Sequence, residues 1–400
     1  MPYQPPQKIL DKYADLLVNF ALNSGKGVKP GEVILVQVPE FAKPMLISLQ
    51  RVILKAKAHM ILQYSPDGLS REFYQLASDK QIAFFPEKYL KARVETVDHS
   101  IAIIGEADLR ELEGISPHKV MMRQKAWKPY MEWRDKKEDN RKFTWVLALY
   151  GNEAMAKEAK MSVKEYWKEI IKACYLDAPS PIAKWKAVYA ELHRIRSRLD
   201  KLKIQKVRVL GKNVDLTIGI GKNRIWKGGD GRNIPGFEIY TTPDREKVDG
   251  HISFNVPLYR MGTVTKGIKL EFKNGTVVKA TAKQGEKFLK EMIATPGADH
   301  IGEFSMTDNR LSRITKFMAE TLFDENVGGK YGNSHIALGH AIRDTYPGNK
   351  KTLTEKQWLK MGYNESVIHT DIFTTEDRTV TATLENGKIV VIYRKGRFTI

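Results

Sequence analysis

The first half of the chain alternates between two kinds of hydrophobic pattern. Apolar residues recur at helical spacing over residues 8–22 and 45–57, which predicts helices there. Short apolar runs bounded by turn residues predict buried strands. The predicted strands cover residues 32–38, 59–63, 97–104 and 144–149. Because strands that alternate with helices form parallel sheets covered by those helices, we expect an α/β fold with a mostly parallel sheet.

The second half has a different pattern, rich in glycine, threonine and β-branched residues. Asn274-Gly275 and Asn386-Gly387 each lie between two strand-like runs and predict hairpin turns. Two long helices, predicted over residues 162–175 and 181–202, lead from the first half into the second, and helices are predicted within the second half over residues 285–293 and 312–320. We therefore expect an α+β domain with a mixed or antiparallel sheet in this half. The predicted domains are residues 1–204 and 205–400.

The composition is that of a folded protein with a basic surface. The 400 residues are 42% hydrophobic and 10% aromatic, which is enough for sizeable cores and excludes a mainly disordered chain. Lysine and arginine total 66 against 47 acidic residues, a net charge of +19. The basic excess is spread over both halves, and no RNP-like strand or zinc-finger spacing occurs. Nucleic acid is therefore not the expected partner.

Cysteine content and hydropathy indicate the compartment. The single cysteine, Cys174, cannot form an internal disulfide, which fits a reducing cytoplasm. No apolar run approaches the roughly 18 residues that span a bilayer, and the N-terminus lacks the features of a signal peptide. We expect a cytoplasmic protein without membrane contact.

Carboxylate and imidazole side chains in the second half form the candidate chemistry. His369 and Asp371 are the most informative pair, because the segment SVIHTDIFT is β-branched and strand-like. Residues i and i+2 of a strand point to the same face, about 6–7 Å apart along the backbone. Glu238, Glu303 and His335 are the further candidates. Carboxylates mixed with imidazoles suit Zn²⁺, Co²⁺ or Mn²⁺, and five such ligands exceed one tetrahedral site and suggest two metals.

Each candidate also has an ordinary explanation. An isolated H-x-D pair is most often exposed or hydrogen-bonded, a single glutamate is usually a surface carboxylate, and a lone histidine is usually a satisfied core residue. The remaining histidines have no better claim by spacing. No G-x-G-x-x-G follows a strand and no G-x-S-x-G occurs, which weakens dinucleotide-binding and serine-hydrolase functions.

The chain resembles the M29 family of metallo-aminopeptidases over most of its length, most specifically over residues 211–400. The motifs that carry the resemblance lie at residues 214–217, 230–243, 302–304, 324–329, 335–339 and 369–371. The resemblance implies that two divalent metal ions are bound by Glu238, Glu303, His335, His369 and Asp371. It also implies that a homodimer with enclosed sites removes the first residue from short peptides that have a free N-terminus.

The resemblance leaves one role open and includes two departures. Glu303 could be a metal ligand or the general base. Ile342 stands where the family has a tyrosine, seven residues after His335, and in a helix it would share the face of that histidine. We therefore expect a weakened catalytic site. Phe237 replaces the family's glycine before Glu238, so we expect a reshaped loop. A metal-binding homologue without peptidase activity and a nucleic-acid-binding protein with an inherited fold stay as alternatives.

Overall fold

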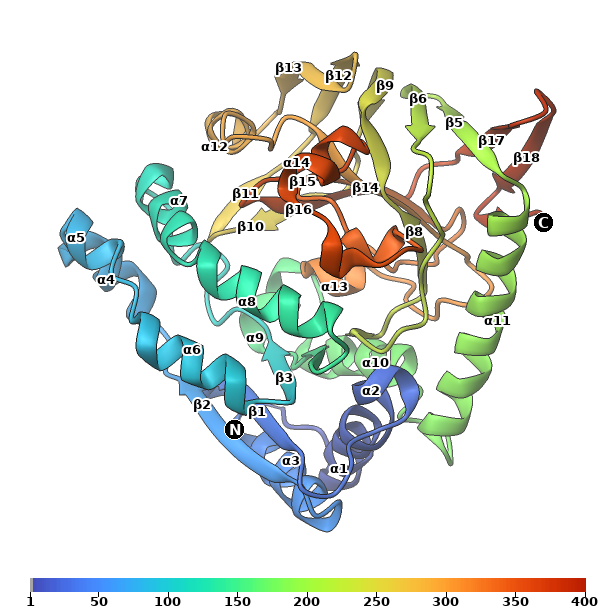
Figure 1. Ribbon diagram of the computed structural model, residues 1–400. Coiled ribbons are helices and arrows are strands. Elements are labelled where there is room, and N and C mark those ends of the chain that lie inside the picture. Colours follow the sequence, from blue (N-terminus) through green and yellow to red (C-terminus); the bar gives the residue numbers. More distant parts are fainter. Residues whose placement is uncertain (1–2) are drawn as a thin grey trace. The chain divides into compact units, whose positions relative to one another are not determined.

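The computed structural model describes residues 3–400, which form two compact units (Figure 1). Unit 1 comprises the residues up to 187 together with 230–236 and 318–322, and unit 2 comprises residues 188–229, 237–317 and 323–400. Helix α11 (Pro181–Lys201) contributes residues to both sets. The predicted division into domains of residues 1–204 and 205–400 stays a prediction.

Unit 1 is built on a five-stranded, entirely parallel sheet in the order β2-β1-β3-β4-β7. Its strands are β1 (Val33–Pro39), β2 (His59–Ser65), β3 (His99–Ile104), β4 (Thr144–Leu149) and β7 (Asn233–Ile234). Its helices are α1 (Gln7–Leu16), α2 (Leu22–Gly25), α3 (Lys43–Lys55), α4 (Leu69–Leu76), α5 (Asp79–Ile82), α6 (Glu87–Thr96), α7 (Pro117–Ala126), α8 (Lys128–Asp139), α9 (Glu153–Glu158) and α10 (Val163–Ala173). This arrangement confirms the α/β prediction, because each predicted strand of the first half forms.

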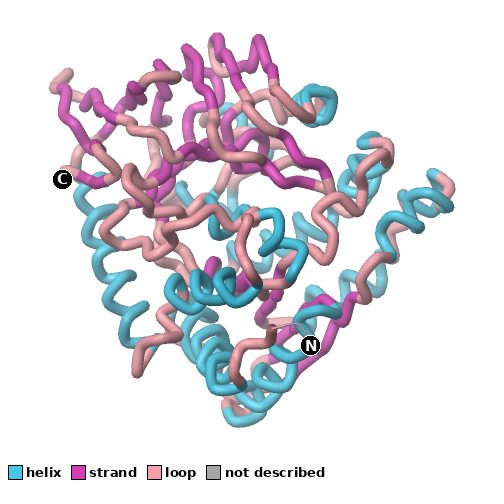
Figure 2. Tube along the Cα trace, turned by 180° about the vertical axis from the view of Figure 1, so that it is seen from behind, coloured by secondary structure: helices cyan, strands magenta, loops and turns pink. Residues whose placement is uncertain are grey.

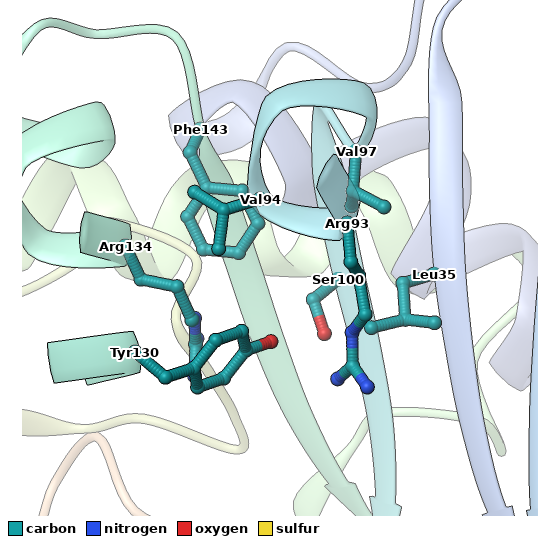
Figure 3. Close-up of a pocket in the computed structure, with 8 residues that line it drawn as sticks. All are labelled: Leu35, Arg93, Val94, Val97, Ser100, Tyr130, Arg134 and Phe143. Carbon is teal, nitrogen blue, oxygen red and sulfur yellow. The ribbon is translucent and has the colours of Figure 1, made fainter. Parts of the chain in front are cut away.

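A small pocket lies where α6 and α8 meet β1 and β3 (Figure 3). Arg93 of α6 and Arg134 of α8 flank Tyr130, with guanidinium carbons 5.3 and 5.9 Å from its ring centroid. Arg134 also lies 5.1 Å from the ring centroid of Phe143. These cation–π contacts explain how two arginines are accommodated in a largely apolar setting.

Unit 2 contains an eight-stranded antiparallel sheet in the order β13-β12-β9-β6-β5-β17-β18-β19. Strand is its prevailing element, shown in magenta in Figure 2. The strands are β5 (Ile204–Gly211), β6 (Val214–Ile220), β9 (Pro243–Ser253), β12 (Lys269–Lys273), β13 (Thr276–Thr281), β17 (Thr379–Leu384), β18 (Ile389–Arg394) and β19 (Arg397–Phe398). The expected hairpins at 274–275 and 386–387 join β12 to β13 and β17 to β18.

A second antiparallel sheet of unit 2, in the order β16-β15-β14-β8, carries the candidate metal ligands. Its strands are β8 (Glu238–Thr241), β14 (Ile301–Thr307), β15 (Asn333–Gly339) and β16 (His369–Thr374). The remaining elements are the hairpin strands β10 (Leu258–Arg260) and β11 (Thr263–Thr265) and the helices α12 (Glu286–Ile293), α13 (Thr321–Asp324) and α14 (Glu355–Lys360). The prediction of an α+β fold with an antiparallel sheet is therefore confirmed.

The helix expected over residues 312–320 is wrong, because this segment is irregular. The Ser312 hydroxyl donates to the carbonyl of Asn326 at 2.5 Å and accepts from the amide of Ile314. The Ile314 carbonyl in turn accepts from the amide of Gly328 at 2.9 Å. Such side-chain bonds to the backbone compete with helix formation, which residue spacing does not reveal. Among residues 3–400, no helix has the length and apolar character that a membrane crossing requires.

Candidate metal centre

The strand register places all five predicted ligands on one face of the four-stranded sheet. Residues directly opposite each other in an antiparallel pair, and residues two apart in one strand, share a face. Ser305 on β14 lies opposite His335 on β15, and Thr307 on β14 lies opposite Glu238 on β8. Ala337 lies between Glu303 on β14 and Asp371 on β16. His369, two residues before Asp371, completes the set.

The five side chains meet at their polar ends. The Nε2 atom of His335 lies 3.3 Å from Oε2 of Glu238 and 3.7 Å from Oε1 of Glu303. The Nε2 atom of His369 lies 3.3 Å from Oε2 of Glu303 and 3.4 Å from Oδ1 of Asp371. The expected convergence of His369 and Asp371 from one strand is therefore present. Glu303 is the central member, because each of its oxygens faces a different imidazole.

The small side chain of Ala337 leaves space in which these five side chains converge. It is fully buried at the centre of β15, with Glu303 on one neighbouring strand and Asp371 on the other. A methyl group at this position keeps the middle of the acidic face free of bulk. Any larger side chain there would project toward the same carboxylates, because it would leave the sheet on the same side.

Glu325, which lies in the motif at residues 324–329, is a sixth member of the cluster and was not among the predicted ligands. One of its oxygens lies within 4.8 Å of ligand atoms from both His335 and Asp371. It follows α13 in a loop and is 5% exposed. Because it belongs to no strand pattern, spacing gave no sign of it. Its neighbour Asn326 fixes the backbone before Glu238, since its side-chain oxygen accepts from the amide of Phe237 at 2.6 Å.

The local environment raises the pKa values of Glu325, His335 and His369, so these groups retain protons. Burial raises the pKa of Glu325 well above its usual value, and the charges of Glu238 and Asp371 act in the same direction. Burial alone would lower the pKa of His335, but hydrogen bonds to Glu238 and Glu303 outweigh it and raise that pKa well above its ordinary value. The pKa of His369 is raised similarly against burial by Asp371 and Glu303.

Asp371 shows the opposite shift. Burial would raise the pKa of its carboxyl, but the charge of His369 and the hydrogen bond to it lower that pKa to about 2. The cluster therefore combines an ionised carboxylate with imidazoles that retain protons. Positive charge stabilises these buried carboxylates, and divalent cations can supply it in place of protons. The donor set of carboxylate oxygens and imidazole nitrogens fits Zn²⁺, Co²⁺ or Mn²⁺.

Comparison with known proteins agrees with this chemistry. The family model described as "Thermophilic metalloprotease (M29)" matches residues 6–398. The chain belongs to the M29 family of metalloproteases. Aminopeptidase T of Thermus thermophilus is 28% identical, with 98% of each chain covered, and aminopeptidase PepS of Streptococcus thermophilus is 27% identical with the same coverage. The solved structure titled "Wild-type AmpT from Thermus thermophilus" superposes with a TM-score of 0.83 at 25% identity, over 98% of this chain and all of that one.

Family membership confirms the resemblance and the prediction that this M29 protein is a metallopeptidase enzyme. The match extends through the first half, where the sequence motifs were weak, so the α/β unit is also a family feature. The assignment of Glu238, Glu303, His335, His369 and Asp371 as metal ligands stays a prediction, and so does the number of metals.

The helical setting expected for Ile342 is wrong. His335 lies in strand β15, and Ile342 lies in an extended segment beyond the end of that strand. Its amide donates to the Thr242 hydroxyl at 3.1 Å, and its carbonyl accepts from the same hydroxyl at 3.1 Å. The i, i+7 argument for a shared helix face therefore does not apply to this M29 chain. The reason is that Ile336, Ala337 and Leu338 form a continuous apolar run, which fits a fully buried strand as well as a helix.

Proposed function

We propose that this M29 protein removes the N-terminal residue from short peptides with the help of two divalent cations. The observation that carries the proposal is the position of Glu303. It belongs to two ligand groups, one with Glu238 and His335 and the other with His369 and Asp371. A carboxylate whose two oxygens face different imidazoles is suited to bridge two cations. Glu325 would be a sixth ligand, because one of its oxygens lies within 4.8 Å of ligand atoms of His335 and Asp371.

The charge of the cluster also favours two cations over one. Its carboxylates are Glu238, Glu303, Glu325 and Asp371. Four carboxylates in a buried setting are costly unless compensated, and one divalent cation would neutralise only half of that charge. Two divalent cations held here would activate a water molecule and polarise the carbonyl of the scissile bond.

The remaining steps fall to this chain's own side chains. The free ammonium group of the peptide would be held by carboxylates on the solvent-reachable side, where Asp371 and Glu238 have side chains that are 17% and 14% exposed. Such a contact confines cleavage to the first residue. A carboxylate must also carry a proton to the leaving amine. The predicted general-base role of Glu303 stays a prediction, and its central position favours the bridging role.

Metal removal tests the proposal. After exhaustive chelation the protein should release no leucine from leucyl-glycine, and Co²⁺, Zn²⁺ or Mn²⁺ should restore activity at two ions per chain by elemental analysis. N-acetyl-leucyl-glycine should resist hydrolysis in every state. Activity that survives chelation, or equal cleavage of the blocked peptide, would contradict the proposal. Saturation at one ion per chain would contradict the two-metal part alone.

The proposal includes the native assembly and location. We infer a homodimer from the resemblance to the family, and a cytoplasmic location from the single thiol, which is buried at Cys174. Light scattering of the purified protein tests the first, since a monomer at micromolar concentration would contradict it. Fractionation of cells that produce the protein tests the second.

A further inference from the structure

Arg260 is a cation fixed beside the acidic cluster. It ends strand β10, directly before a two-residue turn in which Met261 and Gly262 have φ angles of 51° and 63°. Positive φ at both positions is typical of the type I′ turn that tightly connects hairpin strands. The Nη2 atom of Arg260 donates to the carbonyl oxygen of His369 at 3.2 Å. The hairpin and this hydrogen bond together hold the guanidinium next to the ligand strand β16.

Most of the hydrogen-bonding capacity of Arg260 is unused. A guanidinium carries five N–H donors, and within residues 3–400 only the bond to His369 engages them. The Nε atom is buried and has no acceptor among those residues. No carboxylate of the described chain lies within ion-pair distance, although the charge of Asp371 acts on the guanidinium. A buried donor without a partner is costly, so the Nε atom of Arg260 and the guanidinium that carries it suit an oxygen anion that arrives with a ligand.

Arg260 lies beside the most exposed member of the cluster. His369, whose carbonyl it contacts, has the most exposed side chain of the set at 33%, whereas the side chain of His335 is 1% exposed. Arg260 is itself half-buried. The guanidinium is therefore close to His369 and is influenced by the charge of Asp371, the two members of the cluster with the most exposed side chains.

We propose that Arg260 binds the C-terminal carboxylate of a dipeptide substrate and so determines the preferred peptide length. This inference rests on the proposed aminopeptidase function. In a dipeptide the carboxylate carbon lies about 2.5 Å from the scissile nitrogen, as the N–Cα and Cα–C bond lengths and their angle require. A cation that binds it must therefore lie beside the metal ligands. In a longer peptide an uncharged amide carbonyl takes that place, and a guanidinium pairs better with a carboxylate.

The test compares substrates that differ only in this charge. Leucyl-glycine, leucyl-glycinamide and leucyl-glycyl-glycine are hydrolysed by wild type, Arg260→Gln and Arg260→Lys, each with its metal content measured. Wild type should favour the free acid over the amide by about 10–100-fold in kcat/KM, the range of a charge-assisted hydrogen bond. Arg260→Gln should bring that ratio near one, mainly through KM of the free acid, and leave hydrolysis of the amide within a few-fold. Arg260→Lys should restore part of the ratio.

Arg245→Gln is the matched control, because Arg245 is also half-buried in unit 2, has a buried Nε atom without an acceptor among the described residues, and contacts His300 instead of a ligand. It should keep the wild-type ratio. A wild-type enzyme without preference for the free acid would overturn the inference. So would an Arg260→Gln variant that loses activity on acid and amide equally, since that pattern indicates a role at the scissile carbonyl or in folding. Failure of wild type to hydrolyse any of the three peptides would instead overturn the proposed function.

Discussion

Each unit contains a buried histidine that faces glutamate, and the two histidines differ in their surroundings. In unit 1, His99 is 3% exposed and both of its ring nitrogens are engaged, with Thr144 Oγ1 at 2.8 Å and Glu32 Oε2 at 2.9 Å. Glu32 also accepts from the amide of Lys29 and from the side chain of Asn23. Every member of this network has partners, so it is complete as it stands.

The pair in unit 2 is not complete. The Nε2 atom of His335 faces two glutamates, and its Nδ1 atom is buried without a partner among the described residues. Four carboxylates compete for few donors there. Glu238 accepts from the Ser305 hydroxyl at 2.9 Å, and Glu325 accepts from the Asn326 side-chain amide at 3.4 Å. Burial of a histidine beside a glutamate therefore does not by itself indicate function. An excess of carboxylates over available donors does, because cations must supply the difference.

The largest expected contrast between the two pairs is in catalysis. Glu303→Gln removes the carboxylate that faces both imidazoles, and kcat/KM for leucyl-glycine should fall on the order of 10³-fold, since a Lewis-acid centre contributes several kcal/mol. Glu32→Gln, the same substitution in the complete network, should leave kcat/KM within a few-fold. Steady-state kinetics at saturating metal measures both. Equal losses in the two variants would mean that the contrast is one of stability and not of function.

A second contrast is the effect of a larger side chain at a buried alanine in one strand of each unit. Ala337→Val adds two methyl groups where the acidic side chains converge and should weaken metal affinity about 10–100-fold, as substitutions around metal ligands do. Ala148→Val adds the same groups at a fully buried position of strand β4 in unit 1 and should cost about 1–3 kcal/mol of stability without changing metal affinity. Isothermal titration with Zn²⁺ compares them. Unchanged affinity in Ala337→Val would show that the cations lie away from this position.

The sequence predicted the sheet architecture better than it predicted the site. Strands β1 to β4 of unit 1 and the two hairpins of unit 2 follow from apolar runs and Asn-Gly turns, which are local signals. His369 and Asp371 were also accessible, because a strand places them on one face. His335 and His99 could not be told apart by spacing, since both begin or lie within apolar strand segments and differ only in partners brought from distant residues. Glu325, Ala337 and Arg260 depend on register and loop position, which no local pattern encodes.

The smallest expected contrast is in the pH dependence of stability of the chelated protein. Burial and neighbouring charge raise the pKa of Glu325. Its contribution to the free energy of unfolding is therefore fully present below its unfolded pKa, and it is lost as the pH rises through its pKa in the folded state. Glu32 behaves oppositely. Burial opposes its ionisation, but the hydrogen bonds from Lys29 and His99 prevail and lower its pKa, so it contributes stability above its unfolded pKa of about 4.3 and loses it as the pH falls.

Substitution of each glutamate by glutamine should therefore shift stability in opposite directions. In the chelated protein at pH 8, Glu325→Gln should raise the midpoint of thermal unfolding, because it removes a buried carboxylate that ionises at a cost, whereas Glu32→Gln should lower it. About 1 kcal/mol in each case corresponds to a few degrees for units of this size. At pH 4.5 the stabilisation by Glu325→Gln should vanish. With Zn²⁺ added, Glu325→Gln should no longer unfold at a higher temperature than wild type, because the wild-type carboxylate then has a cation to bind. If Glu325→Gln is less stable than wild type in chelator at pH 8, the carboxyl is already satisfied by the fold and Glu325 belongs with Glu32 as a structural residue.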